Sequence, residues 1–251
     1  MNALKIASYN IHKGYSQFNR RFVLHELRER LRELDADIVF LQEVQGADRR
    51  NKPRSQLDGA HPQHEFLAHE SWLHHAYGKN SVYDAGHHGN AILSRYPISS
   101  WDNQDISAHR FESRGVLHCE MDFPGSEKKL HCLCVHLGLF SSGRAQQMQG
   151  LVDRVQRLVP ADAPLIIAGD FNDWRNQAQH LLVQQLQLRE AFEVASGKLA
   201  RSFPCGFPLL RMDRIYIRGF SIEAVEVHAH QPWNKISDHA ALCATLNFTS
   251  A

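Results

Sequence analysis

The chain has 251 residues and a formal net charge of +1 at pH 7 when its 17 histidines are counted as neutral. Hydrophobic residues make up 43% and charged residues 22%, which is enough apolar material for a packed core. The small net charge excludes a gross basic field of the kind that holds nucleic acid, so any basic contact surface has to be local. We expect one domain over residues 1–251.

Cysteine usage and the start of the chain indicate a compartment. The number of cysteines is odd, and no Cys-x-x-Cys pair occurs, which favours buried free thiols in a reducing environment over disulfides or zinc. A strand-like run begins at Leu4, which argues against a signal peptide, and no apolar run approaches the roughly 18 residues of a membrane span. The sequence therefore predicts a cytoplasmic protein with no transmembrane segment.

The first part of the chain follows a strand–helix–strand order. Leu4 to Tyr9 is a predicted strand that ends at Asn10, and Asn19 to Leu34 has the leucine spacing of an amphipathic helix. Asp37 to Leu41 is a second buried strand, followed directly by Gln42 and Glu43. Units of this kind gather polar chemistry at their strand ends.

Regular patterning is lost from Val44 to His69. A small basic cluster, Arg49 to Arg54, lies within this segment, which is either a loop on the substrate side or a plain solvated loop. Asn80 to Trp101 then holds two strand candidates around Gly86-His87-His88-Gly89-Asn90.

A hairpin and two helices are predicted in the middle of the chain. Gly115 to Phe123 and Lys129 to Leu137 read as its two strands. Ser141 to Val159 is predicted as a helix with Ser141 or Ser142 as N-cap, and Asn176 to Leu188 as a shorter one.

The last fifty residues combine an irregular segment with three strands. Ala200 to Arg211 contains two prolines, which preclude an ordinary helix. Its apolar side chains are either core or the lip of a pocket, with core favoured for Phe203. The predicted strands are Met212 to Ile217, Ile222 to Val227 and Ala241 to Leu246.

The stretch from Pro164 to Trp174 is the most informative. Leu165 to Ala168 reads as a short buried strand, and strand alternation puts Asp170 and Asn172 on one side with the intervening phenylalanine in the core. A carboxylate here can take a proton from water or hold a metal, and an amide can donate to a phosphoryl oxygen. Gly-Asp and Asn-Asp are also ordinary turn residues, so a turn is the alternative.

Similar polar residues recur at other strand ends, which predicts a converging site. Oxygen ligands with histidines, and no thiolate motif, suit magnesium or manganese better than zinc. The sequence has neither a serine nucleophile elbow nor a Walker-type phosphate loop. The recurring positions are Asn10, Glu43, His136, Asp170 with Asn172, Asp213, and Asp238 with His239.

These motifs resemble the endonuclease/exonuclease/phosphatase superfamily, which includes DNase I, abasic-site endonucleases of the exonuclease III class, inositol-polyphosphate 5-phosphatases and neutral sphingomyelinases. The chain resembles uncharacterised bacterial members more than the DNA-repair enzymes. The resemblance implies an α/β fold: a four-layer sandwich of two mixed β-sheets packed face to face, with helices on the outside. The matching pieces are Ser8-Tyr9-Asn10, Leu41-Gln42-Glu43-Val44, Gly89 to Arg95, Val135-His136-Leu137, Gly169-Asp170-Phe171-Asn172, Met212-Asp213-Arg214-Ile215 and Ser237-Asp238-His239.

The resemblance also implies roles for individual residues. Glu43 would bind Mg²⁺ (or Mn²⁺), Asn10 would help place the ion, and Asp238 would be an outer or second metal ligand. Asp170 would orient and deprotonate the attacking water.

The remaining roles concern the phosphate. Asn172 would donate to it, and His239, oriented by Asp213, would contact its oxygens. His136 would stabilise charge or protonate the leaving oxygen, and Arg114 is a candidate phosphate contact. One position departs from the pattern: His12 stands where abasic endonucleases place an aspartate.

The resulting hypothesis is a divalent-metal-dependent hydrolase that cleaves a phosphodiester in DNA or a phospholipid. A phosphomonoesterase acting on a soluble phosphate ester is one alternative. A catalytically inactive binding module on the same scaffold is another. The choice of substrate is expected to lie in the segments 44–69 and 200–211, where the family signal fades.

Overall fold

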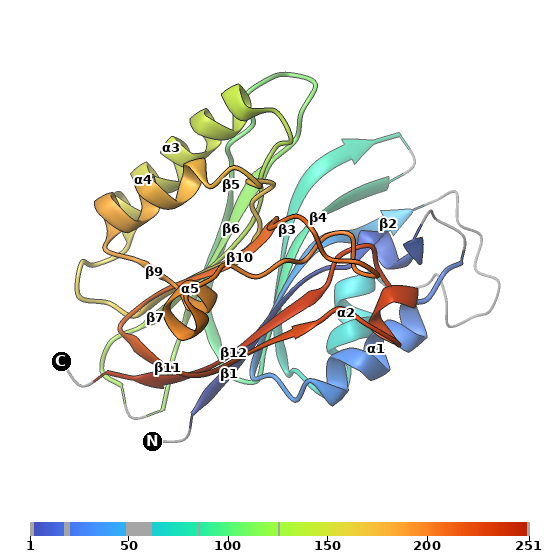
Figure 1. Cartoon of the computed structure of the whole chain (residues 1–251), viewed down its shortest axis with the longest axis horizontal. Helices are drawn as coiled ribbons and strands as arrows, with labels where there is room; N and C mark the ends of the chain where they lie inside the picture. Colours follow the sequence, from blue (N-terminus) through green and yellow to red (C-terminus); the bar gives the residue numbers. More distant parts are fainter. Residues whose placement is uncertain (1–2, 18–20, 49–61, 85, 125, 250–251) are drawn as a thin grey trace.

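The structure, a computed structural model, describes residues 3–17, 21–48, 62–84, 86–124 and 126–249. Two six-stranded mixed sheets form its centre, and the main helices lie outside them (Figure 1). The first sheet has the order β11-β12-β1-β2-β4-β3 and the second the order β5-β6-β7-β8-β10-β9. The first sheet consists of β1 (Leu4–Asn10), β2 (Ile38–Asp48), β3 (His74–Tyr83), β4 (Gly86–Ser94), β11 (Phe220–His228) and β12 (Ala241–Phe248).

The second sheet and the helices complete the fold. The strands are β5 (Ile98–Asp105), β6 (Gly115–Met121), β7 (Leu130–His136), β8 (Leu165–Asp170), β9 (Arg189–Glu190) and β10 (Asp213–Arg218). The helices are η1 (His12–Gly14), α1 (Leu24–Glu33), α2 (Gln63–Ala68), α3 (Ser141–Leu158), α4 (Gln177–Leu186), α5 (Ala191–Ser196) and η3 (Trp233–Lys235).

Strand alternation builds the four layers. Along β1, Ile6 belongs to the central core between the two sheets, whereas Ala7 belongs to the outer core beneath α1. Along β8, Ile166 faces the central core, and Ile167 belongs to the cluster that includes residues of α3 and α4. Each sheet therefore buries both faces, which explains its continuous apolar runs. The predicted four-layer α/β sandwich is confirmed.

The register brings the predicted polar positions to one edge of the sandwich. β1 and β2 are parallel with Asn10 opposite Gln42, and β7 and β8 are parallel with His136 opposite Asp170. β10 runs antiparallel to β8, so its first residue, Asp213, also lies opposite Asp170. Strand ends from both sheets thus meet at the same place.

Several predicted boundaries were wrong in the amino-terminal part. The first helix begins at Leu24, and Phe22, which was predicted to be helical, instead forms a β-bridge with Tyr15. The predicted start at Asn19 lies outside the described residues. The segment 44–69 is not a continuous loop: β2 runs on to Asp48, and α2 occupies residues 63–68. The basic cluster Arg49 to Arg54 lies outside the described residues.

Two predictions in the second half also need correction. The residue before α3 is Phe140, and neither a Ser141 nor a Ser142 hydroxyl caps the helix. In the segment 200–211, Phe203 is half-buried against the His239 ring at a centroid distance of 5.0 Å, so it lies at the site and not in the core. Phe207, another residue proposed as core or lip, is 71% exposed.

Candidate active site

Asp170 is the centre of the cluster. It ends β8, and only 1% of its surface is exposed. Its Oδ1 accepts from the backbone N–H of Asn172 (2.9 Å), and its Oδ2 accepts from the Asn10 amide (3.2 Å). Two imidazoles also face Oδ2: His136 Nε2 at 3.5 Å and His239 Nε2 at 3.7 Å. The predicted convergence of residues from β1, β7, β8 and the segment before β12 is therefore present.

The surroundings of Asp170 make its carboxylate a stronger base than that of an exposed aspartate. Burial raises the pKa of Asp170, the nearby charge of Asp213 raises it further, and the His239 charge acts in the opposite sense. A carboxyl group whose pKa lies closer to neutrality accepts a proton from water more readily than an exposed aspartate.

Asp213 and His239 form a buried pair. Asp213 Oδ2 lies 2.9 Å from His239 Nδ1, which leaves Nε2 of the same ring directed at Asp170. Burial alone lowers the pKa of His239, but the charges of Asp213 and then Asp170 outweigh it and raise that pKa. The imidazole is therefore held protonated between two carboxylates.

Two serine hydroxyls fix the backbone around this pair. Ser202 Oγ accepts from the N–H groups of Met212 (3.3 Å) and Asp213 (3.2 Å), which sets the start of β10. Ser237 Oγ donates to the Asn10 carbonyl (2.7 Å) and accepts from the His239 N–H (3.2 Å). The His239 loop is thereby tied to the end of β1.

Glu43 enters the site through a β-bulge. The pairing of β2 with β4 shifts between Leu41 and Val44, and Glu43 has a φ of 57°, in the left-handed region that non-glycine residues rarely adopt. The Asn10 amide lies 3.5 Å from Glu43 Oε1, and Lys13 Nζ lies 3.9 Å from Oε2. Asn10 thus stands between the carboxylates of Glu43 and Asp170, which come from different sheets.

The donor set fits a hard divalent cation. Glu43 and Asp170 supply carboxylate oxygens, and Asp213 Oδ1 is buried with no hydrogen-bond partner among the described residues. One carboxylate oxygen of Asp170 and one of Asp213 also lie within 4.8 Å of each other. The Asn10 Oδ1 accepts from the His12 N–H (3.1 Å), so the Asn10 amide nitrogen faces the two carboxylates. In this orientation Asn10 positions the carboxylates.

Asp238, the third predicted metal residue, lies at the margin of the cluster. Its Oδ1 is 3.9 Å from His12 Nδ1 and 3.4 Å from Ser237 Oγ. His12, which stands where abasic endonucleases place an aspartate, is therefore a neighbour of Asp238 in space.

The remaining predicted residues line the same edge. Burial, followed by the charge of Arg114, lowers the pKa of His136 well below its ordinary value, so this ring is neutral. Arg114 is half-buried, with its Nε 3.6 Å from Glu112 Oε1. Asn172 has a left-handed φ of 51°, and its amide donates to the Leu137 carbonyl (2.9 Å). Asn172 therefore adopts a turn conformation next to Asp170, and its donation to phosphate stays a prediction.

Sequence reasoning missed Lys13, Ser202 and Ser237 as parts of the site. Lys13 lies in the turn directly after β1, with a φ of 57°, and Ser237 lies inside the Ser-Asp-His motif, so both were near recognised signals. Ser202 had no local signal, because its contacts depend on how the segment 200–211 folds over β10.

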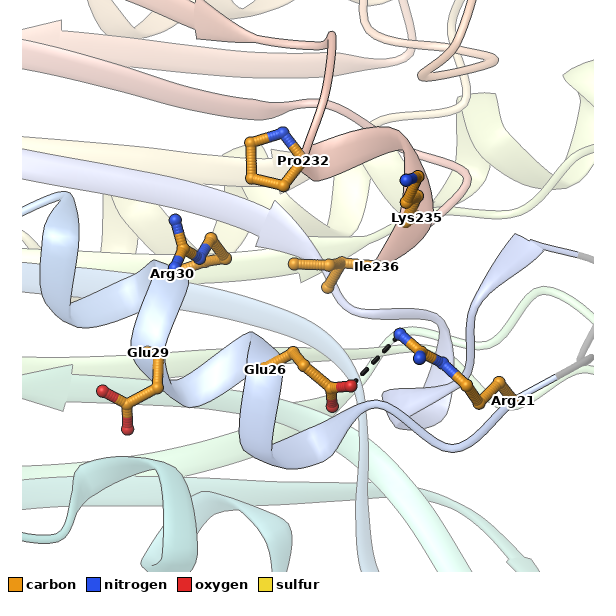
Figure 2. A pocket seen from close by; sticks show the side chains of 7 residues that line it. All are labelled: Arg21, Glu26, Glu29, Arg30, Pro232, Lys235 and Ile236. Atoms are coloured by element: carbon orange, nitrogen blue, oxygen red, sulfur yellow. Dashed lines mark ion pairs between the residues drawn. The ribbon is translucent and has the colours of Figure 1, made fainter.

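A pocket of about 300 Å³ lies elsewhere, between α1 and η3 (Figure 2). An Arg21–Glu26 ion pair (3.1 Å) closes one side of it. Its lining shares no residue with the predicted site. The lining residues are Arg21, Glu26, Glu29, Arg30, Pro232, Lys235 and Ile236.

None of the helices in the described ranges is long and apolar enough to cross a membrane. All five cysteines are free and buried.

Comparisons with known proteins give a relative of similar sequence and several structures of similar fold. The chain is 46% identical over 245 residues to a protein of Escherichia coli strain K12 named "Uncharacterized protein YbhP", covering 98% of this chain and 96% of that protein. A crystal structure of an endonuclease/exonuclease/phosphatase from Beutenbergia cavernae matches with a TM-score of 0.78 at 18% identity, covering 100% of this chain and 73% of that one. Truncated TDP2 of Caenorhabditis elegans matches with a TM-score of 0.69 at 20% identity, covering 98% of both chains. These two structural similarities concern the fold alone.

The family assignment comes from the sequence. The profile of the Endonuclease/Exonuclease/phosphatase family matches residues 7–239, a range that includes every residue placed in the cluster above. The chain therefore belongs to the endonuclease/exonuclease/phosphatase family.

Proposed function

We propose that this protein is a divalent-metal-dependent hydrolase that cleaves a phosphodiester, with DNA or a phospholipid as the substrate class. The observation that carries the proposal is the position of Asp170, within 3.2 Å of the Asn10 amide, 3.5 Å of His136 and 3.7 Å of His239, with Glu43 on the far side of Asn10. A buried base can activate water, imidazoles can stabilise phosphoryl oxygens, and an acidic ligand can hold a metal ion, so this group of residues supports attack of water on a phosphoryl group.

The residues of the candidate site have different parts in the proposed reaction. Asp170 takes the proton of the attacking water. His239, oriented by Asp213 and held protonated, presents Nε2 to the phosphoryl oxygens, and neutral His136 donates a hydrogen bond toward the leaving oxygen. Asn172 and Arg114 serve as further donors to the phosphate.

Glu43 would hold Mg²⁺ or Mn²⁺, with Asn10 positioning its carboxylate and Asp238 in the outer shell. A bound divalent ion supplies positive charge to the phosphoryl oxygens, where negative charge grows as water attacks.

The proposal predicts Mg²⁺- or Mn²⁺-dependent hydrolysis of bis-p-nitrophenyl phosphate that EDTA abolishes. Asp170→Asn and His239→Ala should each lower kcat by about 10²–10³, because each removes a group that acts on the reacting atoms. The measurement is p-nitrophenol release at saturating substrate, with circular dichroism to establish that each variant is folded. Asp153→Asn, which changes an exposed aspartate of α3, is the matched control and should retain full activity.

Other results would point to other functions. Hydrolysis of p-nitrophenyl phosphate in preference to the diester would favour the phosphomonoesterase. No turnover of either compound with Mg²⁺ or Mn²⁺ would contradict the proposal and favour a binding module.

A further inference from the structure

Four segments border the candidate active site, and we call them the mouth rim. They are residues 107–114, 137–144, 171–176 and 200–211. Two of them directly follow His136 and Asp170 along the chain, and a third carries Phe203, whose ring lies against His239. The mouth rim is therefore the part of the surface that a substrate meets next to these catalytic residues.

Contacts join the four segments into one surface. The Gln147 side chain of α3 joins two segments, because it donates to Glu112 and accepts from the Gly138 N–H (2.7 Å). The Asn172 amide donates to the Leu137 carbonyl (2.9 Å). The Arg214 guanidinium joins the segments 171–176 and 200–211: it donates to the carbonyl of Asp173 (3.1 Å) and to that of Arg211 (2.5 Å).

The mouth rim exposes large hydrophobic side chains from all four segments. Exposed apolar residues scattered singly are ordinary, but a group of them on the segments that border one site marks an interaction surface. They are Phe111 (87% exposed), Leu139 (54%), Phe140 (76%), Trp174 (39%), Phe207 (71%), Leu209 (52%) and Leu210 (38%).

A buried arginine holds part of this surface in its outward position. Arg144 is 3% exposed, and it donates to the carbonyls of Gly138 (3.2 Å) and Leu139 (2.9 Å). Its guanidinium also lies over the Trp174 ring, 5.5 Å from the centroid. These contacts fix the backbone beneath Leu139 and Phe140, so their exposure is built into the fold.

The mouth rim is also cationic, although the whole chain carries only +1. Its segments contain six arginines and two acids, Glu112 and Asp173. Both acids are turned to internal partners: Glu112 accepts from Gln147, and buried Asp173 lies 3.7 Å from Arg144. Within these four segments, all of which the structure describes, Arg110, Arg175 and Arg201 are exposed and no acid is.

We propose that the mouth rim docks the active site on an anionic lipid bilayer, so that the substrate is a phosphodiester in the headgroup of a membrane phospholipid. Exposed phenylalanine, leucine and tryptophan gain free energy by entering the acyl–headgroup boundary, and arginines among them pair with anionic headgroups. Nucleic acid would satisfy the arginines, but it offers leucine side chains no apolar volume to enter. This inference rests on the proposed function for the reaction at the candidate active site.

The test measures binding of the whole protein to sonicated vesicles by flotation. Wild type should bind vesicles that contain phosphatidylglycerol and phosphatidylcholine at a 1:1 ratio. It should bind vesicles of pure phosphatidylcholine more than tenfold less tightly, because each interfacial arginine that loses its anionic headgroups lowers the affinity by about fivefold. Phe140→Ser with Phe207→Ser should lower binding to the mixed vesicles by more than tenfold. The control, Leu73→Ser with Val194→Ser, removes two other exposed hydrophobic side chains (82% and 49%) outside the mouth rim and should bind as wild type does.

Hydrolysis of bis-p-nitrophenyl phosphate separates this inference from the proposed function. Phe140→Ser with Phe207→Ser should keep wild-type activity on this soluble compound while losing activity on vesicle phospholipid. Wild type that hydrolyses the soluble diester without floating, or that binds a DNA oligonucleotide in preference to vesicles, would overturn the docking proposal and leave the proposed function standing. Vesicle binding without hydrolysis of the soluble diester or of phospholipid would support the docking proposal and contradict the proposed function.

Discussion

At the scale of single residues, the buried Asp213–His239 pair separates orientation from chemistry. Asp213 Oδ2 lies 2.9 Å from His239 Nδ1 and acts through that ring in the proposed reaction, so Asp213 is a positioning residue. Asp213→Asn should lower kcat by about 10²–10⁴ with little change in KM, because an asparagine neither holds the ring protonated nor selects its tautomer. Steady-state kinetics on bis-p-nitrophenyl phosphate measures this split.

Ser202→Ala supplies the comparison for this pair. The Ser202 hydroxyl accepts from two buried backbone N–H groups at the start of β10, and its removal leaves both without an acceptor. This variant should lose about 1–3 kcal/mol of unfolding free energy while keeping the charge pair. If Asp213→Asn instead lowered the free energy of unfolding and left kcat near the wild-type value, its assigned role in orienting His239 would be wrong.

At the scale of elements, the bulge in β2 places Glu43 at the cost of a rare backbone conformation. Its φ of 57° disfavours any residue with a Cβ by about 1–2 kcal/mol. Glu43→Gly and Glu43→Ala both remove the carboxylate, and both should raise the Mg²⁺ concentration needed for half-maximal activity. Glu43→Gly should be at least as stable as Glu43→Ala in urea unfolding, because glycine relieves the strain.

The matched control for the bulge is Glu226, an exposed residue of β11 without a positive φ. There the order should reverse, with glycine about 0.5–1 kcal/mol less stable than alanine. The same order at both positions would contradict the assigned strain at Glu43.

The bulge also shows why part of the fold escaped sequence-based prediction. Buried strands such as β1 and β8 were predictable, because burial on both faces leaves continuous apolar runs. β2 was lost beyond Glu43, since the bulge interrupts its alternation. β3 and β5 carry mostly polar residues that are half-buried or exposed, and their pairing with the next strands, β4 and β6, determines their structure. The candidate site residues were predicted from motifs, whereas the place of Ser202 depends on a contact between segments.

At the scale of the whole molecule, the outer face of the second sheet carries a polar pair beneath α3. His118 of β6 and His131 of β7 are each 4% exposed, and their rings are joined by an Nε2–Nδ1 contact of 2.9 Å. Arg154 of α3 lies 3.4 Å from His118 Nδ1 and also pairs with Asp102 of β5. Because a guanidinium can only donate, His118 Nδ1 is the acceptor, and its ring is neutral with the proton on Nε2.

This pair makes the stability of the sandwich depend on pH. Burial, then the neighbouring His131, lowers the pKa of His118 to about 4, and burial also lowers that of His131. In the unfolded chain a histidine has a pKa of about 6.5, so below that pH the unfolded state binds protons that the folded state does not. The free energy of unfolding is therefore unaffected by this pair above about pH 6.5 and falls as the pH drops toward 4.

His118→Gln should flatten this dependence. For His118 alone, the loss between pH 7 and pH 5 is about 2 kcal/mol, from roughly 1.4 kcal/mol for each pH unit below 6.5. Urea unfolding at pH 7 and pH 5 should therefore show a smaller difference for His118→Gln than for wild type. His109→Gln, which changes an exposed histidine, should leave the wild-type difference intact. An unchanged difference in His118→Gln would mean that other groups control acid unfolding of this protein.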